Sequence, residues 1–309
     1  MKGGTRAAVR KTATNVRTSR AARRSPEEDG AGTTRAGARG RNAAGGAEDG
    51  GMCRHGTTMT EILLRPNERL ADLNHRGRRI IQREDRFRFS MDAVLLAHFP
   101  RYSAGCRVLD LGTGTGVMPL LIAEEAGAIE AVELDAEMAE MASRSVSLND
   151  LSDVIHVRQG DYRDVRALCP PESFDVVLAN PPYGGASQGP AAKEAVAPAR
   201  QELTTTLDHV VRAARWALRY HGRFAMIYRP DRLAEVFAAL TAHRLEPKRM
   251  RLVEPQAGVP AKLVLIEAMQ GGAPGGLVIL PTLHVRDENG AYTKELSRIY
   301  GMTENESGE

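Results

Sequence analysis

The stretch from Ser173 to Tyr183 brings together residue types that could act on a planar amine. Its first part, Phe174 to Ala179, is a short apolar run rich in valine, which is typical of a strand buried on both faces. Asn180 ends this run, and two prolines and a tyrosine follow; the prolines fix φ and offer no N–H groups. We therefore expect an amide, a rigid turn and an aromatic ring at the carboxyl end of a buried strand, where ligands bind in open α/β sheets.

The chemistry that this corner suits is methylation of an amino group on a planar base. Such an amine is a poor nucleophile because its lone pair is delocalised into the ring. The side-chain oxygen of Asn180 and the backbone carbonyl of Pro181 could accept its two hydrogens and draw the nitrogen toward a nucleophilic geometry. Pro182 makes the turn rigid, and Tyr183 could stack on the base for roughly 1–3 kcal/mol. The alternative is a diproline turn that only ends a strand, since Asn-Pro is a common turn signal.

A glycine loop upstream indicates a cofactor site. Residues 107–111 are expected to form a buried strand, and the loop that follows contains Gly112, Thr113, Gly114 and Gly116. Glycines without a Cβ let the backbone approach a ligand closely. The pattern alone also fits a dinucleotide site. Together with Asp110 in front of it, the run resembles the first motif of class I S-adenosyl-L-methionine methyltransferases, which implies a sulfonium cofactor whose ammonium group a carboxylate helps to hold.

Three acidic residues follow or end three successive expected strands. Asp110 is the candidate for the amino-acid end of the cofactor. Glu133 ends the expected strand 129–132, about 20 positions beyond the glycine loop, which suits the ribose hydroxyls of a bound adenosine. Asp161 follows the expected strand 154–157 and could accept a hydrogen bond from the adenine amine. The alternatives are a surface carboxylate for Glu133 and an Asx-type turn for Asp161.

These residues must be positioned by alternating strands and helices, which predicts an α/β fold. Helices are expected over the ranges 117–125, 136–148, 203–218 and 233–243, and a fifth parallel strand over 222–228. Residues 249–253 and 263–268 form an expected antiparallel closing pair. This order is typical of a Rossmann-like class I methyltransferase with a seven-stranded, mostly parallel sheet. We also expect an edge strand over 277–285 and a short helix over 294–300.

Charged residues are distributed unevenly along the 309-residue chain. Residues 1–58 carry 12 Lys/Arg and 5 Asp/Glu and almost no large apolar side chains, which predicts a disordered basic extension. The extension is interpreted either as an arm that binds nucleic acid or as a segment that is not translated because the start of the chain is predicted too far upstream. The rest of the chain has a net charge of −4, so its charge alone does not indicate a nucleic-acid partner. Residues 59–301 are predicted to form the methyltransferase domain and residues 302–309 a polar tail.

Two local features have expected structural positions. Ser90 is a plausible N-cap, with Asp92 in the first turn of the following helix, where its charge suits the helix dipole. In the helix over 203–218, Arg212, Arg215 and Arg219 lie off the apolar stripe, so solvated positions are expected for them.

The composition restricts the cellular setting. The chain has no apolar run of 18 or more residues, so no membrane span is predicted. It also has no apolar segment near the N-terminus, so no secretory signal is predicted. The three cysteines are far apart, without the paired spacing of a zinc site, so a reducing, cytoplasmic location without a metal is expected.

Together, these segments resemble one family, the bacterial tRNA (adenine-N6) methyltransferases that act beside the anticodon of a valine tRNA. The resemblance covers about Met59 to Gly301. The segments that carry it are Phe87 to Leu96, the glycine loop, Asn180 to Tyr183, Ala199 to Glu202, Pro247 to Arg251, and Tyr292-Thr293. The family often has histidine where Gln201 stands, which leaves a role there open. The resemblance implies a tRNA partner and N6-methylation of adenosine, and a monomer is favoured.

On this resemblance Phe89 and Asp92 join the candidate cofactor contacts. The full candidate cofactor set is Asp110, Gly112, Thr113, Gly114, Gly116, Glu133, Asp161, Asn180, Phe89 and Asp92. The candidate catalytic set is Asn180, Pro181, Pro182 and Tyr183.

Other functions share the same corner. A glutamine methyltransferase acting on release factors normally has a helical domain ahead of the glycine loop, and only about 50 folded residues precede it here. A DNA adenine methyltransferase usually carries extra sequence for site recognition, which is not visible. An RNA-binding protein with an inactive cofactor fold is the non-enzyme alternative, and it would not need all four residues from Asn180 to Tyr183.

Overall fold

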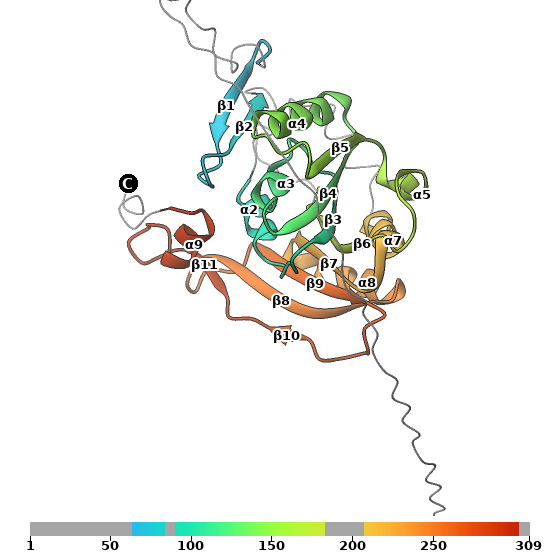
Figure 1. The fold of residues 1–309 in the computed structure, drawn as a ribbon. Helices are drawn as coiled ribbons and strands as arrows, with labels where there is room; N and C mark the ends of the chain where they lie inside the picture. Colours follow the sequence, from blue (N-terminus) through green and yellow to red (C-terminus); the bar gives the residue numbers. More distant parts are fainter. Residues whose placement is uncertain (1–63, 84–89, 183–206, 303–309) are drawn as a thin grey trace, which may run out of the picture. The chain divides into compact units, whose positions relative to one another are not determined.

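Apolar strands and amphipathic helices alternate in the computed structural model, which describes residues 64–83, 90–182 and 207–302 (Figure 1). The predicted boundary between 58 and 59 lies outside the described residues, as does nearly all of the tail 302–309, and both remain predictions. The parallel strands are β3 (Cys106–Leu111), β4 (Ala126–Glu133), β5 (Ile155–Gln159), β6 (Phe174–Ala179) and β7 (Leu218–Tyr228). Their apolar composition lets both faces of the sheet be covered.

The order of the strands confirms the predicted class I arrangement. The parallel strands lie in the order β5-β4-β3-β6-β7, and β9 (Leu263–Gln270) pairs antiparallel with both β7 and β8 (Leu245–Gln256). The order reverses at β3, so β4 lies on one side of it and β6 on the other. This is the topological switch point at which open α/β sheets bind ligands.

Two apolar cores flank the sheet because successive residues of a strand point to opposite faces. Val108 of β3 and Leu178 of β6 belong to one core, whereas Leu109 and Val177 belong to the other. The first core packs against α2 (Met91–Ala97), α3 (Val117–Leu121) and α4 (Ala136–Leu148). The second packs against α5 (Val165–Leu168), α7 (Leu207–Ala217) and α8 (Leu233–Ala242) (Figure 1).

The described sheet extends beyond the seven predicted strands at one edge. The expected edge strand over 277–285 is divided into β10 (Val278–Ile279) and β11 (Leu283–Arg286), which both pair with β8. Pro281 lies between them, and its missing N–H prevents continuous pairing. The short C-terminal helix is α9 (Lys294–Ile299), and the helix expected over 117–125 is shorter, because α3 ends at Leu121 and β4 already begins at Ala126.

An antiparallel hairpin that the sequence analysis did not anticipate precedes this core. It consists of β1 (Glu68–Asp72) and β2 (Arg79–Arg83). Its charged residues pair with α4: Glu68 accepts from Arg144 at 2.6 Å, and Arg65 lies 2.8 Å from Glu140. Arg76, Arg78 and Arg83 also lie within 4.0 Å of glutamates, so several arginines of this region are neutralised. Two short 3-10 helices, η1 (Tyr162–Asp164) and η3 (Pro230–Arg232), complete the described elements. Within the described ranges, no helix has the length and apolarity needed to cross a membrane.

Candidate active site

The register of the sheet brings the predicted site residues to one edge. Leu111 at the end of β3 pairs with Val132 of β4 on one side and with Ala179 of β6 on the other. The residues that follow these three positions are Gly112, Glu133 and Asn180. The glycine loop, the acidic end of β4 and the Asn-Pro corner therefore emerge side by side, as predicted.

The glycine loop turns back over β4 in a conformation that favours glycine. The amides of Gly112 and Thr113 both donate to the Val132 carbonyl, at 2.9 and 3.0 Å. Gly112, Gly114 and Gly116 have φ values of 80°, 61° and 89°, in the left-handed region. At Gly116, the N-cap of α3, an added Cβ would lie 3.3 Å from the Cβ of Ala142. The glycines therefore allow both the turn and the close approach of α3 to α4.

Glu133 is a buried carboxylate held by two backbone amides. Its Oε2 accepts from the Gly114 N–H at 2.8 Å and its Oε1 from the Asp135 N–H at 2.9 Å. Burial raises the pKa of Glu133, and the amides oppose that rise. A carboxylate offers about four lone-pair positions, so it can still accept from ligand hydroxyls. This geometry suits the predicted contact with ribose.

Asp110 is the most unusual group of the site. It is fully buried, and among the described residues neither carboxylate oxygen has a hydrogen-bond partner; the Thr113 hydroxyl also lacks one. Burial raises the pKa of Asp110 to about 7, with a further rise from the charge of Glu133. The Thr113 hydroxyl lowers this pKa, although no hydrogen bond of normal geometry joins the two groups. A buried, unpaired carboxylate is costly, and a cationic ligand group would relieve that cost.

Asp161 forms the Asx-type turn that was the alternative to its ligand role. It is the N-cap of η1, its Oδ1 accepts from the Arg163 N–H at 2.8 Å, and its Oδ2 accepts from Arg163 Nε at 2.7 Å. Arg163 holds the pKa of Asp161 below its ordinary value. Both oxygens are thus already engaged, and the contact with adenine remains a prediction.

The Asn-Pro corner follows β6 directly. Asn180 is half-buried, Pro181 is buried and Pro182 is exposed. Tyr183 lies outside the described residues, and so does Phe89. Asp92 is placed as expected in the first turn of α2. Burial raises the pKa of Tyr300 to about 12, and the charges of Tyr292 and Asp92 add to that rise. Ser90 occupies the N-cap position of α2, but its side chain makes no capping hydrogen bond.

Two residues at this edge were not identified from the sequence. Asp135 both orients Glu133 through its N–H and caps α4, accepting from Glu137 N at 2.9 Å. An aspartate directly before a helical pattern is a capping signal that could have revealed it. Tyr162 is the second: an added Cβ at Gly112 would lie 3.8 Å from its ring. Its position directly after Asp161 was the available signal.

The residues present fit S-adenosyl-L-methionine. The unpaired carboxylate of Asp110 suits the ammonium group, the free lone pairs of Glu133 suit the ribose, and the glycine loop leaves space at the backbone. All three lie at the switch point of the sheet.

Comparisons with known proteins agree with this reading. Residues 90–240 match the model of the family described as Methyltransferase small domain. The chain is 30% identical over 185 residues to the tRNA1(Val) (adenine(37)-N6)-methyltransferase of Citrobacter koseri. The aligned region covers 56% of this chain and 72% of that protein. It is 28% identical over 222 residues to the protein of the same name from Porphyromonas gingivalis, which covers 69% of this chain and 86% of the relative.

A solved structure resembles the fold as well. The crystal structure of a predicted O-methyltransferase, protein Atu636 from Agrobacterium tumefaciens, aligns with a TM-score of 0.56 and 28% identity, covering 69% of this chain and 98% of that one.

Proposed function

Since the chain belongs to the family of the tRNA1(Val) (adenine(37)-N6)-methyltransferases, we propose that it methylates the N6 amine of an adenosine beside the anticodon of a valine tRNA. S-adenosyl-L-methionine supplies the methyl group as an electrophilic sulfonium substituent. The observation that carries this proposal is the pairing of Asp110 with Leu178, two residues before Asn180. Because of this pairing, the glycine loop that follows β3 lies beside the Asn-Pro corner that follows β6, and this corner suits an amine.

On the cofactor side, three residues divide the binding. Asp110 offers its buried carboxylate to the ammonium group, and Glu133 offers its free lone pairs to the ribose hydroxyls. Gly114 fixes the orientation of Glu133 through its N–H. Because these groups are held by the backbone of neighbouring strands, little reorganisation is needed when the cofactor binds.

On the substrate side, the target adenine must leave the stacked anticodon loop, at a cost of a few kcal/mol. Asn180 Oδ1 and the Pro181 carbonyl accept the two amine hydrogens and orient the nitrogen toward the methyl group. Tyr183 stacks on the extruded ring. No general base is needed before attack, because the nitrogen becomes acidic only after it gains the methyl group, and its proton then leaves to water.

The two acceptors distinguish this function from hydroxyl methylation. An amine presents two hydrogens to Asn180 and Pro181, whereas a hydroxyl presents one and needs a base to remove it. An amine is therefore the better match, even though the structural relative from Agrobacterium tumefaciens is described as a predicted O-methyltransferase.

The decisive experiment offers several acceptors in parallel. The protein is incubated with labelled S-adenosyl-L-methionine and, separately, total tRNA, duplex DNA or a release factor, and the products are digested and identified by mass spectrometry. We expect N6-methyladenosine in tRNA alone. A methyl group on guanine, on a hydroxyl or on a protein glutamine would show that the proposed function is wrong.

Further proposals concern the setting of the reaction. Residues 59–301 are proposed to form the catalytic domain. If the basic extension is dispensable, a chain that begins at Met59 is expected to methylate tRNA with the same kinetics as the full chain. A steeper salt dependence of tRNA binding for the full chain would assign the extension a phosphate-binding role. A cytoplasmic location is proposed for the enzyme, and a monomer is favoured.

A further inference from the structure

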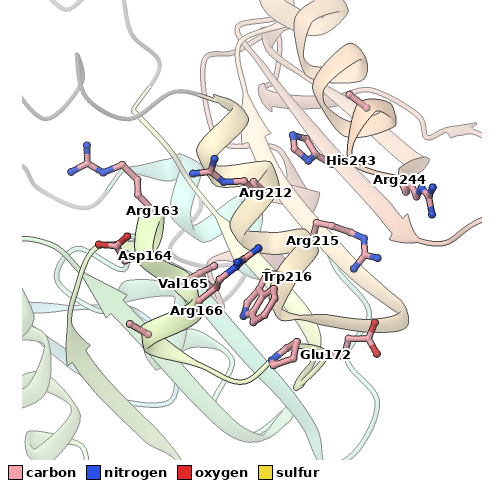
Figure 2. Close-up of a pocket in the computed structure, with 13 residues that line it drawn as sticks. Arg163, Asp164, Val165, Arg166, Glu172, Arg212, Arg215, Trp216, His243 and Arg244 are labelled. Atoms are coloured by element: carbon pink, nitrogen blue, oxygen red, sulfur yellow. The ribbon is translucent and has the colours of Figure 1, made fainter.

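An arginine-lined groove lies on the helical face formed by α5, α7 and α8, away from the Asn-Pro corner. Its cavity has a volume of about 860 Å³. Figure 2 shows arginines from three separate segments on its walls: Arg163 and Arg166 around α5, Arg212 and Arg215 from α7, and Arg244 after α8. Trp216 lies between them (Figure 2). The name arginine groove is used below for these six residues.

Most of the positive charge in the arginine groove is not neutralised. Of its five arginines, Arg163 alone forms an ion pair with a carboxylate within the described part of the chain, with Asp161. The groove wall includes two acidic residues, Asp164 and Glu172, and neither is ion-paired with these arginines. The contrast is the hairpin region, where arginines such as Arg65 are neutralised by glutamates of α4.

The floor of the groove is rigidly built. The Trp216 indole Nε1 donates to the Cys169 carbonyl at 3.1 Å, and the Arg166 guanidinium lies over the ring, 4.8 Å from its centre. The buried side-chain amide of Gln270, in the orientation that satisfies both its nitrogen and its oxygen, accepts from Arg215. Gln270 is neutral, so it orients this arginine without cancelling its charge.

One end of the groove adjoins the cofactor edge of the sheet. Arg163 is bonded to Asp161, which follows β5 at the same edge as Glu133. The other end lies near Glu172, just before β6 begins at Phe174, at the opposite edge. The groove thus leads from the cofactor edge across one face of the domain. Along the sheet, Asn180 and Asp161 follow β6 and β5, three strand spacings or roughly 14 Å apart.

We propose that the arginine groove binds the sugar-phosphate backbone of the tRNA, outside the anticodon nucleotide that is methylated. The proposal rests on the proposed function and adds the substrate surface that overall charge could not indicate, because residues 59–309 have a net charge of −4. Planar guanidinium groups match phosphate in a bidentate geometry. An open groove with several unneutralised arginines suits a continuous polyanion, whose phosphates repeat at regular intervals.

The test compares two triple variants of the full chain with the same change in charge. The groove variant is R212Q/R215Q/R244Q. The control variant is R79Q/R101Q/R298Q, which removes three exposed arginines that have no ion pair with a carboxylate among the described residues. Binding of a valine tRNA transcript is measured from 50 to 300 mM salt, and methyl transfer gives KM and kcat.

The groove variant is expected to bind tRNA roughly 10- to 100-fold more weakly than the control. Its plot of log K against log salt is expected to be flatter by about 2 to 3, since each lost phosphate contact removes about 0.7–0.9 from the slope. The weaker binding is expected to raise the KM for tRNA, and the affinity for S-adenosylhomocysteine is expected to be unchanged. The lysine variant R212K/R215K/R244K keeps the charge and is expected to restore the slope, which separates charge loss from misfolding.

Equal salt slopes and equal affinities for the groove and control variants would overturn the proposal, and so would a lysine variant with the flat slope of the glutamine variant. These outcomes would leave methylation of tRNA by the unaltered protein intact. Conversely, absence of tRNA methylation by the unaltered protein would contradict the proposed function, whatever the binding data give.

Discussion

The Gly114 N–H donates to Glu133 Oε2 at 2.8 Å, so the loop that follows β3 is joined directly to the residue that ends β4. The bond lies beside the switch point of the sheet, between two strands that pair in parallel. It fixes the orientation of a buried carboxylate, and it leaves lone pairs of that carboxylate for a ligand.

We expect Glu133→Ala to weaken binding of S-adenosylhomocysteine by about 1–3 kcal/mol, because a hydrogen-bond acceptor to the ribose is lost. Titration calorimetry at pH 7.5 measures the change. Glu130→Ala is the matched control, since Glu130 lies on the same strand but three residues before its carboxyl end. Unchanged affinity in Glu133→Ala would remove the ribose assignment.

Asp110 is expected to make the cofactor-free protein less stable as the pH rises. Its folded pKa of about 7 lies above its ordinary value of 3.8, so the folded state holds a proton that the unfolded state releases. The contribution of Asp110 to the free energy of unfolding is therefore most favourable below about pH 4, falls as the pH rises through about 7, and changes no further above that. Relative to Asp110→Asn, the free energy of unfolding should fall by on the order of 4 kcal/mol, measured by urea unfolding at several pH values.

The same carboxyl should couple cofactor binding to proton release. An ammonium group beside Asp110 favours the carboxylate, so affinity for S-adenosylhomocysteine is expected to rise with pH up to about 7. Asp110→Asn should bind more weakly and lose most of this pH dependence. Identical pH profiles for the two proteins would contradict the assignment of Asp110 to the ammonium end.

Gly116→Ala is expected to impair both stability and cofactor binding. The substitution places a side chain at φ 89° and brings its Cβ to 3.3 Å from that of Ala142. Gly290→Ala is the control, because Gly290 also has a positive φ but open space around it. The control should lose about 1 kcal/mol of stability from backbone strain alone. Thermal unfolding and calorimetry should show a larger loss for Gly116→Ala, together with weaker cofactor binding that the control does not share.

At the catalytic corner, we expect Asn180→Ala to lower turnover by roughly 10²- to 10³-fold, as is found when one preorganised hydrogen-bonding group is removed. Affinity for tRNA should remain, since most of it comes from phosphate contacts. Tyr183→Phe should keep much of the activity because the ring is retained, whereas Tyr183→Ala should lose it. Single-turnover assays with a valine tRNA measure all three. Near-normal turnover in Asn180→Ala would contradict the proposed mechanism.

The sequence predicted the strands and loops that carry the candidate site where the signal is local. The valine-rich run before Asn180 and the apolar run before Gly112 specify buried strands, and parallel strands bring their carboxyl ends to one edge. The glycines at 112, 114 and 116 predicted a loop that approaches a ligand, and all three have positive φ. The hairpin β1–β2 was missed because its stabilising partners belong to α4, more than 50 residues away.

Two features depend on distances through space. From the sequence alone, the carboxylate of Asp110 has an ordinary pKa, and only its burial between β4 and β6 raises it. Arg212 and Arg215 were expected to be solvated positions off the apolar stripe of a helix. Arg212 is exposed and Arg215 is half-buried, and both line a groove together with Arg163, Arg166 and Arg244 (Figure 2). The periodicity of a sequence shows which face of a helix is apolar. It does not show which charged residues of other segments lie close to the polar face. The sequence by itself therefore determined the buried strands, the glycine loop and the Asn-Pro corner at a strand end. Only the tertiary structure decided the raised pKa of Asp110 and the clustering of the arginines, because burial and electrostatic proximity arise only when distant segments pack together.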